Sequence, residues 1–124
     1  TRYLIPKIVS DFTARAPHIE LGNTDVARDF SDVRDVARAY RLLAEARPIG
    51  EIFNLCSGEA TALETCIRMA SEITGHDIET KINPGFVRAN EVKTLRGSSE
   101  KLDRLTGHER RYSIRDTMEW MLEN

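Results

Sequence analysis

Features that mark membrane, secreted and metal-binding proteins are missing from this sequence of 124 residues. No apolar run approaches the roughly 20 residues needed to cross a bilayer, and the first residues hold no sustained apolar core of a signal peptide. The two cysteines, Cys56 and Cys66, could pair, but they form no recognised metal spacing. We interpret them as core thiols, Cys56 at the end of a strand and Cys66 on the apolar side of a helix. We therefore expect a cytoplasmic protein without a membrane partner.

An excess of either charge is also missing. The sequence has 18 basic and 20 acidic residues and a net charge of −2, which gives no case for a nucleic-acid binder. Hydrophobic residues make up 40% and charged residues 31% of the chain, an ordinary globular balance. The length suits one modest domain, residues 1–124. Because the chain begins at Thr1 and enters helical periodicity at once, we expect this domain to be part of a longer protein.

The common catalytic motifs are missing as well. No glycine-rich phosphate loop and no His-Glu-x-x-His motif occurs in the sequence. The three histidines, His18, His76 and His108, fall in turns or at strand starts, and we interpret them as surface residues. Taken alone, the chain offers no candidate catalytic residue and no metal site.

Apolar periodicity is what the sequence does contain, and it predicts an α/β chain with a mixed order of elements. A long charged loop at 83–97 follows the last expected strand, and long ordered loops are often functional. The expected strands are 18–21, a short one just before Asp32, 51–55 and 78–82, and the expected helices lie near 3–15, between Asp32 and Pro48, from Thr61 to Gly75, from Ser98 or Ser99 to Gly107, and after a Ser113 cap.

Several of these elements carry a specific packing prediction. Thr61 and Glu64 have the spacing of a capping box. The alternation within 78–82 places Ile78, Thr80 and Ile82 toward a core. In the helix that starts at Asp32, Asp35 suits the positive end of the helix dipole, and one apolar face is formed by Val33, Val36, Ala37, Tyr40, Leu43 and Ala44.

The segment 51–55, Glu-Ile-Phe-Asn-Leu, has too little polar alternation for a half-exposed strand. It is typical of a parallel strand that is covered on both faces. Such a strand needs neighbours, and this chain offers few others of its type. We therefore expect its edge to pair with a sheet outside this chain or with another copy, so that the protein is a homo-oligomer.

Three separated cations suggest a ligand. Lys7 lies at a helix start, Arg28 at a strand end, and Arg88 in the long loop with Glu91 three residues later. Arginine suits bidentate contact with a diphosphate, and a carboxylate can accept hydrogen bonds from paired sugar hydroxyls. Together these residues would recognise a nucleotide diphosphate attached to a sugar. The alternative is that they are solvated charges without a shared ligand.

Three stretches of the sequence resemble a known family. They are LGNTDVARDFSDVRDVARAY at 21–40, GEIFNLCSG at 50–58 and VRANEVKTLRGSSEKLDRLTG at 87–107. The chain is similar to the C-terminal, substrate-binding part of extended short-chain dehydrogenase/reductases that act on nucleotide sugars, above all GDP-4-dehydro-6-deoxy-mannose reductases and GDP-mannose 4,6-dehydratases. The resemblance implies an α/β portion of a Rossmann-type fold that lacks the N-terminal dinucleotide-binding half.

The resemblance also implies roles for single residues. Lys7 matches a lysine that reaches the substrate, Arg28 and Arg88 match arginines on the diphosphate, and Glu91 matches a carboxylate on the ribose hydroxyls. The sequence departs from the family at Ala89, where many members have proline. NAD or NADP would be bound mainly by the N-terminal half, which would be the partner of this chain and would hold the catalytic residues.

The function implied by the resemblance is the substrate-binding half of an enzyme that reduces GDP-4-keto-6-deoxy-mannose with NAD(P)H. One alternative is a GDP-mannose 4,6-dehydratase or a nucleotide-sugar 4-epimerase. Another is a non-catalytic module that binds nucleotide sugars. A glycine-rich loop and a Tyr-x-x-x-Lys motif in the parent gene would favour an enzyme over a module.

Overall fold

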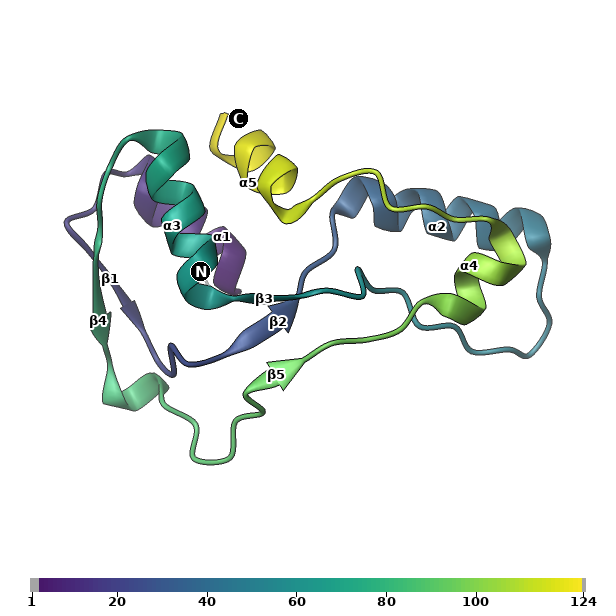
Figure 1. Cartoon of the computed structure of the whole chain (residues 1–124), viewed down its shortest axis with the longest axis horizontal. Coiled ribbons are helices and arrows are strands. Elements are labelled where there is room, and N and C mark those ends of the chain that lie inside the picture. The colour runs from purple at the N-terminus through teal and green to yellow at the C-terminus, as the bar shows by residue number, and fades with distance from the viewer. Residues whose placement is uncertain (1–2, 124) are drawn as a thin grey trace.

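The computed structural model describes residues 3–123 and confirms the α/β class (Figure 1). Helices and strands alternate irregularly along the chain, as the sequence predicts. The elements are α1 (Leu4–Thr13), β1 (His18–Leu21), β2 (Ala27–Asp29), α2 (Val33–Ala46), β3 (Ala60–Ala62), α3 (Leu63–Thr74), β4 (Glu79–Ile82), the 3-10 helix η1 (Pro84–Phe86), β5 (Thr94–Leu95), α4 (Glu100–Thr106) and α5 (Ile114–Glu123).

The strands form two small sheets. In one, β1 pairs with β4 in parallel, with His18 opposite Glu79. In the other, β2 lies between β3, which is antiparallel to it, and β5, which is parallel to it. The β2–β5 pairing joins residues more than 60 positions apart in the chain and places Arg28 opposite Leu95. The second sheet therefore connects the start of α2 to the long loop.

The apolar core lies where α1, α3 and α5 pack together over β1, on the left of Figure 1. The apolar stripe predicted for the first helix is confirmed, since Ile5, Ile8 and Phe12 are buried there. Burying one such side chain contributes roughly 1.5–3 kcal/mol. The other members of the buried cluster are Ile19 and Leu21 from β1, Leu63, Cys66 and Ala70 from α3, and Met118 from α5.

The predicted apolar face of α2 is not part of this core. Val33 is 60% exposed and Tyr40 is 67% exposed, and α2 turns Asp35 and Ala39 inward instead. The Asp35 carboxylate accepts hydrogen bonds from the backbone N–H of Tyr112 and a guanidinium N–H of Arg38, at 3.1 and 2.7 Å. Polar contacts with the chain before α5 therefore hold α2 here, which apolar periodicity alone does not reveal.

The strand predicted at 51–55 is wrong for the chain as described. These residues are extended but pair with no strand in the part of the chain that the structure covers, and Ile52 is 86% exposed. A strand forms only when a partner satisfies its backbone N–H and C=O groups. Consequently Cys56 does not end a strand, although Cys66 is fully buried as predicted. Burial raises the pKa of Cys66 to about 11, so this thiol is unreactive.

Two further packing predictions are wrong. Helix α3 begins after Ala62 without a side-chain cap, because Thr61 is drawn into β3 opposite Arg28. All four residues of β4 are exposed, and only Ile78, just before it, packs on the core. β4 pairs with β1 in a two-stranded sheet, and both faces of β4 are exposed. The alternation of apolar and polar residues in 78–82 therefore does not indicate which side chains are buried.

Several boundary predictions are confirmed. Gly75 and Gly107 end their helices with positive φ angles of 63° and 67°. Ser113 caps α5, since its hydroxyl accepts from the Asp116 N–H at 3.1 Å while the Asp116 carboxylate accepts from the Ser113 N–H at 2.7 Å. The prediction for His108 is wrong, because its side chain is only 8% exposed and contacts the backbone carbonyl of Asp35 at 3.2 Å.

Asp32, the N-cap residue of α2, makes the free energy of unfolding depend on pH. The Asp32 carboxylate is buried and accepts hydrogen bonds from the Arg34 guanidinium, the Arg34 N–H and the Thr117 hydroxyl. Above all the Arg34 contact lowers the pKa of Asp32 from 3.8 to about 2, against the opposing effect of burial.

A carboxyl whose pKa falls on folding stabilises the folded state above its unfolded pKa and loses this contribution as the pH falls through the folded value. We therefore expect the free energy of unfolding to lose about 2 kcal/mol between pH 5 and pH 2 through Asp32 alone. Urea denaturation across this pH range measures the loss. Asp32→Asn should flatten the profile by the same amount, and an unchanged profile would contradict the assignment.

In the part of the chain that the structure describes, no helix is both long enough and apolar enough to span a bilayer.

Candidate functional site

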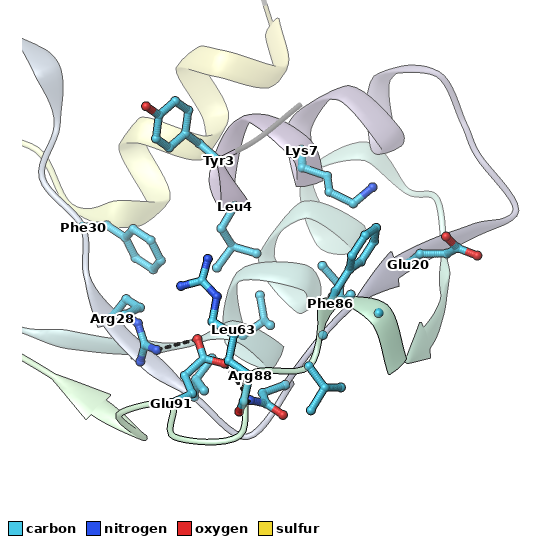
Figure 2. A pocket seen from close by; sticks show the side chains of 16 residues that line it. Tyr3, Leu4, Lys7, Glu20, Arg28, Phe30, Leu63, Phe86, Arg88 and Glu91 are labelled. Atoms are coloured by element: carbon cyan, nitrogen blue, oxygen red, sulfur yellow. Dashed lines mark hydrogen bonds and ion pairs between the residues drawn. The ribbon is translucent and has the colours of Figure 1, made fainter. Parts of the chain in front are cut away.

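All four candidate residues from the sequence line one cavity. Its volume is about 720 Å³, and it lies between the start of α1, the turn after β1, strand β2 and the loop that follows η1 (Figure 2). Lys7, Arg28, Arg88 and Glu91 come from three separate segments of the chain, and folding brings them together. Their placement around a shared cavity was the condition on which the binding hypothesis depended.

The charged end of this cavity is organised by Glu91. One carboxylate oxygen accepts from an Arg28 guanidinium N–H at 2.9 Å, and the other accepts from the Asn23 amide at 2.7 Å. The Arg28 and Glu91 side chains are about one-fifth exposed, so solvent weakens this pair less than it would a fully exposed one. Figure 2 shows the two charged groups meeting at the edge of the cavity.

Backbone pairing explains why these two groups meet. The Ala27 N–H donates to the carbonyl of Lys93 at 2.7 Å, just before β2 and β5 run in parallel. The Arg28 guanidinium also donates to the carbonyls of Ala27 and Lys93, at 2.9 and 3.3 Å. Two backbone carbonyls and the Glu91 carboxylate therefore hold the Arg28 guanidinium at the edge of the cavity.

Of the three candidate cations, Arg88 is the one whose charged group is available to bind a ligand. Its guanidinium makes no hydrogen bond or ion pair with any residue in the range 3–123, whereas its backbone carbonyl accepts from Asn23 at 3.0 Å. Figure 2 shows this side chain extending from the loop toward the middle of the cavity, between Arg28 and Leu4. The backbone of Arg88 is thus anchored and its charged end is available to an anion.

Lys7 lies at the opposite end of the cavity. Its ammonium pairs with Asp11, one helical turn further on, at 3.1 Å, and Figure 2 places it near Phe86 and away from Arg28. The structure therefore places two of the three predicted cations at one end of the cavity with Glu91. The third lies at the far end, across the apolar side chains of Leu4 and Phe86.

Sequence reasoning missed Asn23 and the function of the glycine before it. In the sequence, Gly22-Asn23 indicates only a turn after the strand at 18–21. A Cβ atom on Gly22 would lie 2.3 Å from the carbonyl oxygen of Phe86, so only glycine lets the loop approach β1 this closely. A turn asparagine that faces a charged loop is the one sequence signal that could have indicated this contact.

Asp29 anchors the end of β2 on the other side. Its carboxylate accepts from the backbone N–H groups of Ser57, Gly58 and Gly97, at 2.7, 2.9 and 3.2 Å. Burial raises the pKa of Asp29, but the hydrogen bonds from Ser57, Gly97 and Gly58 outweigh it and hold the pKa below its ordinary value. Asp29 is thus a structural clamp at the strand-to-helix junction. No group of histidine, cysteine and acidic side chains within residues 3–123 could hold a metal ion.

Comparison with known proteins identifies the family. The profile of the family described as GDP-mannose 4,6 dehydratase matches residues 1–121. The chain belongs to this family. Its members modify nucleotide sugars, which agrees with the resemblance seen in the sequence.

Two curated relatives act on GDP-sugars. GDP-6-deoxy-D-talose 4-dehydrogenase of Aggregatibacter actinomycetemcomitans is 35% identical over 98% of this chain and 42% of its own length. GDP-6-deoxy-D-mannose reductase of Pseudomonas aeruginosa is 31% identical over 89% of this chain and 36% of its own length. The chain therefore spans about two fifths of the relatives that it matches.

Solved structures agree with this assignment. A Burkholderia cenocepacia protein provisionally assigned as an epimerase superposes with a TM-score of 0.93 and 50% identity, over 98% of this chain and 40% of that protein. The protein RMD of Pseudomonas aeruginosa, solved with NADPH, gives a TM-score of 0.89 and 27% identity, over 98% of this chain and 41% of that protein. In such structures the matched region is the C-terminal part of the fold, as the sequence predicts.

Proposed function

We propose that this chain forms the substrate-binding part of an oxidoreductase that reduces GDP-4-keto-6-deoxy-mannose with NADPH or NADH. The observation that carries the proposal is the single cavity that contains Arg28, Arg88 and Glu91. Two arginines beside a carboxylate suit a diphosphate that is followed by a ribose. The names of the two GDP-sugar relatives favour a guanine nucleotide.

Each residue has a separate task in this proposal. Arg88 turns its unpaired guanidinium to the diphosphate, and Arg28 adds the donors that its carbonyl partners do not use. Glu91 accepts hydrogen bonds from the ribose hydroxyls, and Lys7 meets the substrate from the other end of the cavity. With the diphosphate fixed at two points, the sugar is held in one orientation, which lowers the entropic cost of reaching the reactive geometry.

The nicotinamide nucleotide is not assigned to the residues of this chain. A dinucleotide site usually needs a glycine-rich turn between a strand and a helix whose N-terminus faces the pyrophosphate. Here β2 leads into α2 through Asp29 and Asp32, whose carboxylates repel phosphate, and β3 leads into α3 without a glycine. A partner half would hold the nicotinamide nucleotide, whose chemistry when bound would be hydride transfer to C4 of the sugar, while this chain binds and orients the sugar nucleotide through Arg28, Arg88 and Glu91. We also propose that this chain packs against the half that binds the nicotinamide nucleotide, and that the protein assembles into a homo-oligomer.

The family description favours a second candidate, a GDP-mannose 4,6-dehydratase. The two reactions differ in their redox balance. A reductase consumes one NADPH for each ketone that it reduces, whereas a dehydratase returns the hydride to the sugar and consumes none. Following NADPH during turnover of GDP-4-keto-6-deoxy-mannose and of GDP-mannose separates the two candidates in the protein that carries this chain.

The binding step has a direct test. We expect GDP to bind at least about tenfold more tightly than guanosine, because only GDP offers anionic oxygens to Arg28 and Arg88. Raising the salt concentration should weaken GDP binding and leave guanosine binding nearly unchanged. Isothermal titration calorimetry measures both affinities, and equal affinities would overturn the diphosphate assignment.

A further inference from the structure

We propose that Asn23 is a positioning residue that fixes Glu91 for contact with the ribose hydroxyls. This inference rests on the proposed function and adds a residue to which the family resemblance gives no role. Asn23 lies in the turn between β1 and β2, and Glu91 lies 68 positions later in the long loop. The fold alone makes them neighbours.

The hydrogen bonds define which end of the Asn23 amide faces the loop. Its nitrogen lies 2.7 Å from a Glu91 carboxylate oxygen and 3.0 Å from the Arg88 carbonyl oxygen. Both partners only accept hydrogen bonds, so the NH₂ group must face them and both of its protons are used. One short side chain therefore holds the backbone of one candidate residue and the carboxylate of the other.

The Glu91 carboxylate keeps the capacity to bind a ligand. Its two oxygens offer about four lone-pair sites, and only Arg28 and Asn23 donate to them among the described residues. Two different donors at two different oxygens fix the plane of the carboxylate. The remaining lone pairs are then directed at fixed positions, as required for a pair of adjacent hydroxyls on one ribose.

Removing Asn23 should leave the arginines able to bind phosphate while Glu91 loses its orientation. Arg28 is held by two backbone carbonyls that do not involve Asn23. Without the amide, the Glu91 carboxylate keeps one donor and can rotate about it. The cost should therefore be larger with a ligand that has ribose hydroxyls than with one that lacks them.

Calorimetry with GDP and with 2′,3′-dideoxy-GDP separates these contributions. We expect Asn23→Ala to weaken GDP binding by about three- to tenfold, the usual range for a hydrogen bond, and to weaken 2′,3′-dideoxy-GDP binding clearly less, because that ligand loses only the effect of the released Arg88 backbone. Asn90→Ala is the matched control, because Asn90 is an exposed asparagine next to Glu91 and, among the described residues, its side chain donates no hydrogen bond to the Glu91 carboxylate. This control should bind both nucleotides like the wild type.

Asn23→Leu provides a second variant with the same branched side-chain shape that is uncharged and has no amide donors. It should show the same selective loss of GDP binding, and thermal unfolding verifies that each variant is folded. If the affinities for both nucleotides weakened equally, the inference would be overturned and Asn23 would be a structural residue. Unchanged GDP binding would also overturn the inference. Failure of the wild-type protein to bind GDP would instead overturn the proposed function itself.

Discussion

Replacing Arg28 with alanine is expected to weaken GDP binding by about 1.5–3 kcal/mol, the usual value of hydrogen bonds to charged groups. The loss has two sources. The guanidinium no longer reaches the diphosphate, and Glu91 loses the donor on one of its oxygens. Arg28→Lys should recover little of the affinity, because an ammonium has only three donors, which two carbonyls and Glu91 would use, and it lacks the planar fork that the guanidinium offers to a diphosphate.

The comparison with Arg88 sharpens this prediction. Arg88→Ala should weaken GDP binding in the same range but leave the stability of the protein unchanged, since the Arg88 guanidinium has no partner among the described residues. Arg96→Ala is the matched control, because Arg96 is an exposed arginine at the end of the same loop. Calorimetry with GDP that gave unchanged affinity for both the Arg28 and Arg88 variants would reject the site.

The largest expected effect on stability comes from Phe12. Its side chain is 1% exposed at the centre of the α1, α3 and α5 cluster and meets the His76 ring edge-on, with the ring centres 6.2 Å apart. Phe12→Ala removes this buried ring and leaves a cavity, which costs about 3–5 kcal/mol. That is a large fraction of the roughly 5–15 kcal/mol that stabilises a typical domain.

Urea denaturation followed by circular dichroism measures this cost. Thr13→Ala is the control, since Thr13 follows Phe12 on the same helix and is exposed. Phe12→Leu should cost less than Phe12→Ala because it leaves a smaller cavity. A change below about 1 kcal/mol for Phe12→Ala, which is usual for surface substitutions, would contradict the assignment of the core.

Local patterns in the sequence predicted the parts of the fold that local chemistry determines. The stripe through Ile8 and Phe12 gave the core side of α1, and Gly75 and Gly107 gave helix ends, because each depends on residues within one or two turns. Strands β3 and β5 were missed because two or three residues show no periodicity. They exist only because β2 lies between them.

The apolar face of α2 was misjudged for a related reason. Val33 and Tyr40 have the right spacing for burial, but the buried positions go to Asp35 and Ala39. The backbone N–H groups that donate to Asp35 lie more than 70 residues away. Asn23 was missed because its partners are equally remote. Charge and placement singled out Arg28, Arg88 and Glu91 and the family resemblance implied their roles, but their meeting at one cavity is a fact that only the fold supplies.

Three aspartates spaced three residues apart at the start of α2 attach the right-hand part of the molecule in Figure 1 to the rest of the chain. The Asp29 carboxylate accepts hydrogen bonds from the backbone N–H groups of residues 57, 58 and 97, and the Asp32 carboxylate accepts one from the Thr117 hydroxyl. The Asp35 carboxylate accepts hydrogen bonds from the backbone just before α5. Neither α2 nor α4 contributes a residue to the main apolar cluster. We therefore expect the part of the chain around α2 to open more easily than the apolar cluster. Only acid strong enough to reach the lowered pKa values of Asp29 and Asp32 should protonate both carboxylates, and it should release the contacts of α2 before the apolar cluster unfolds.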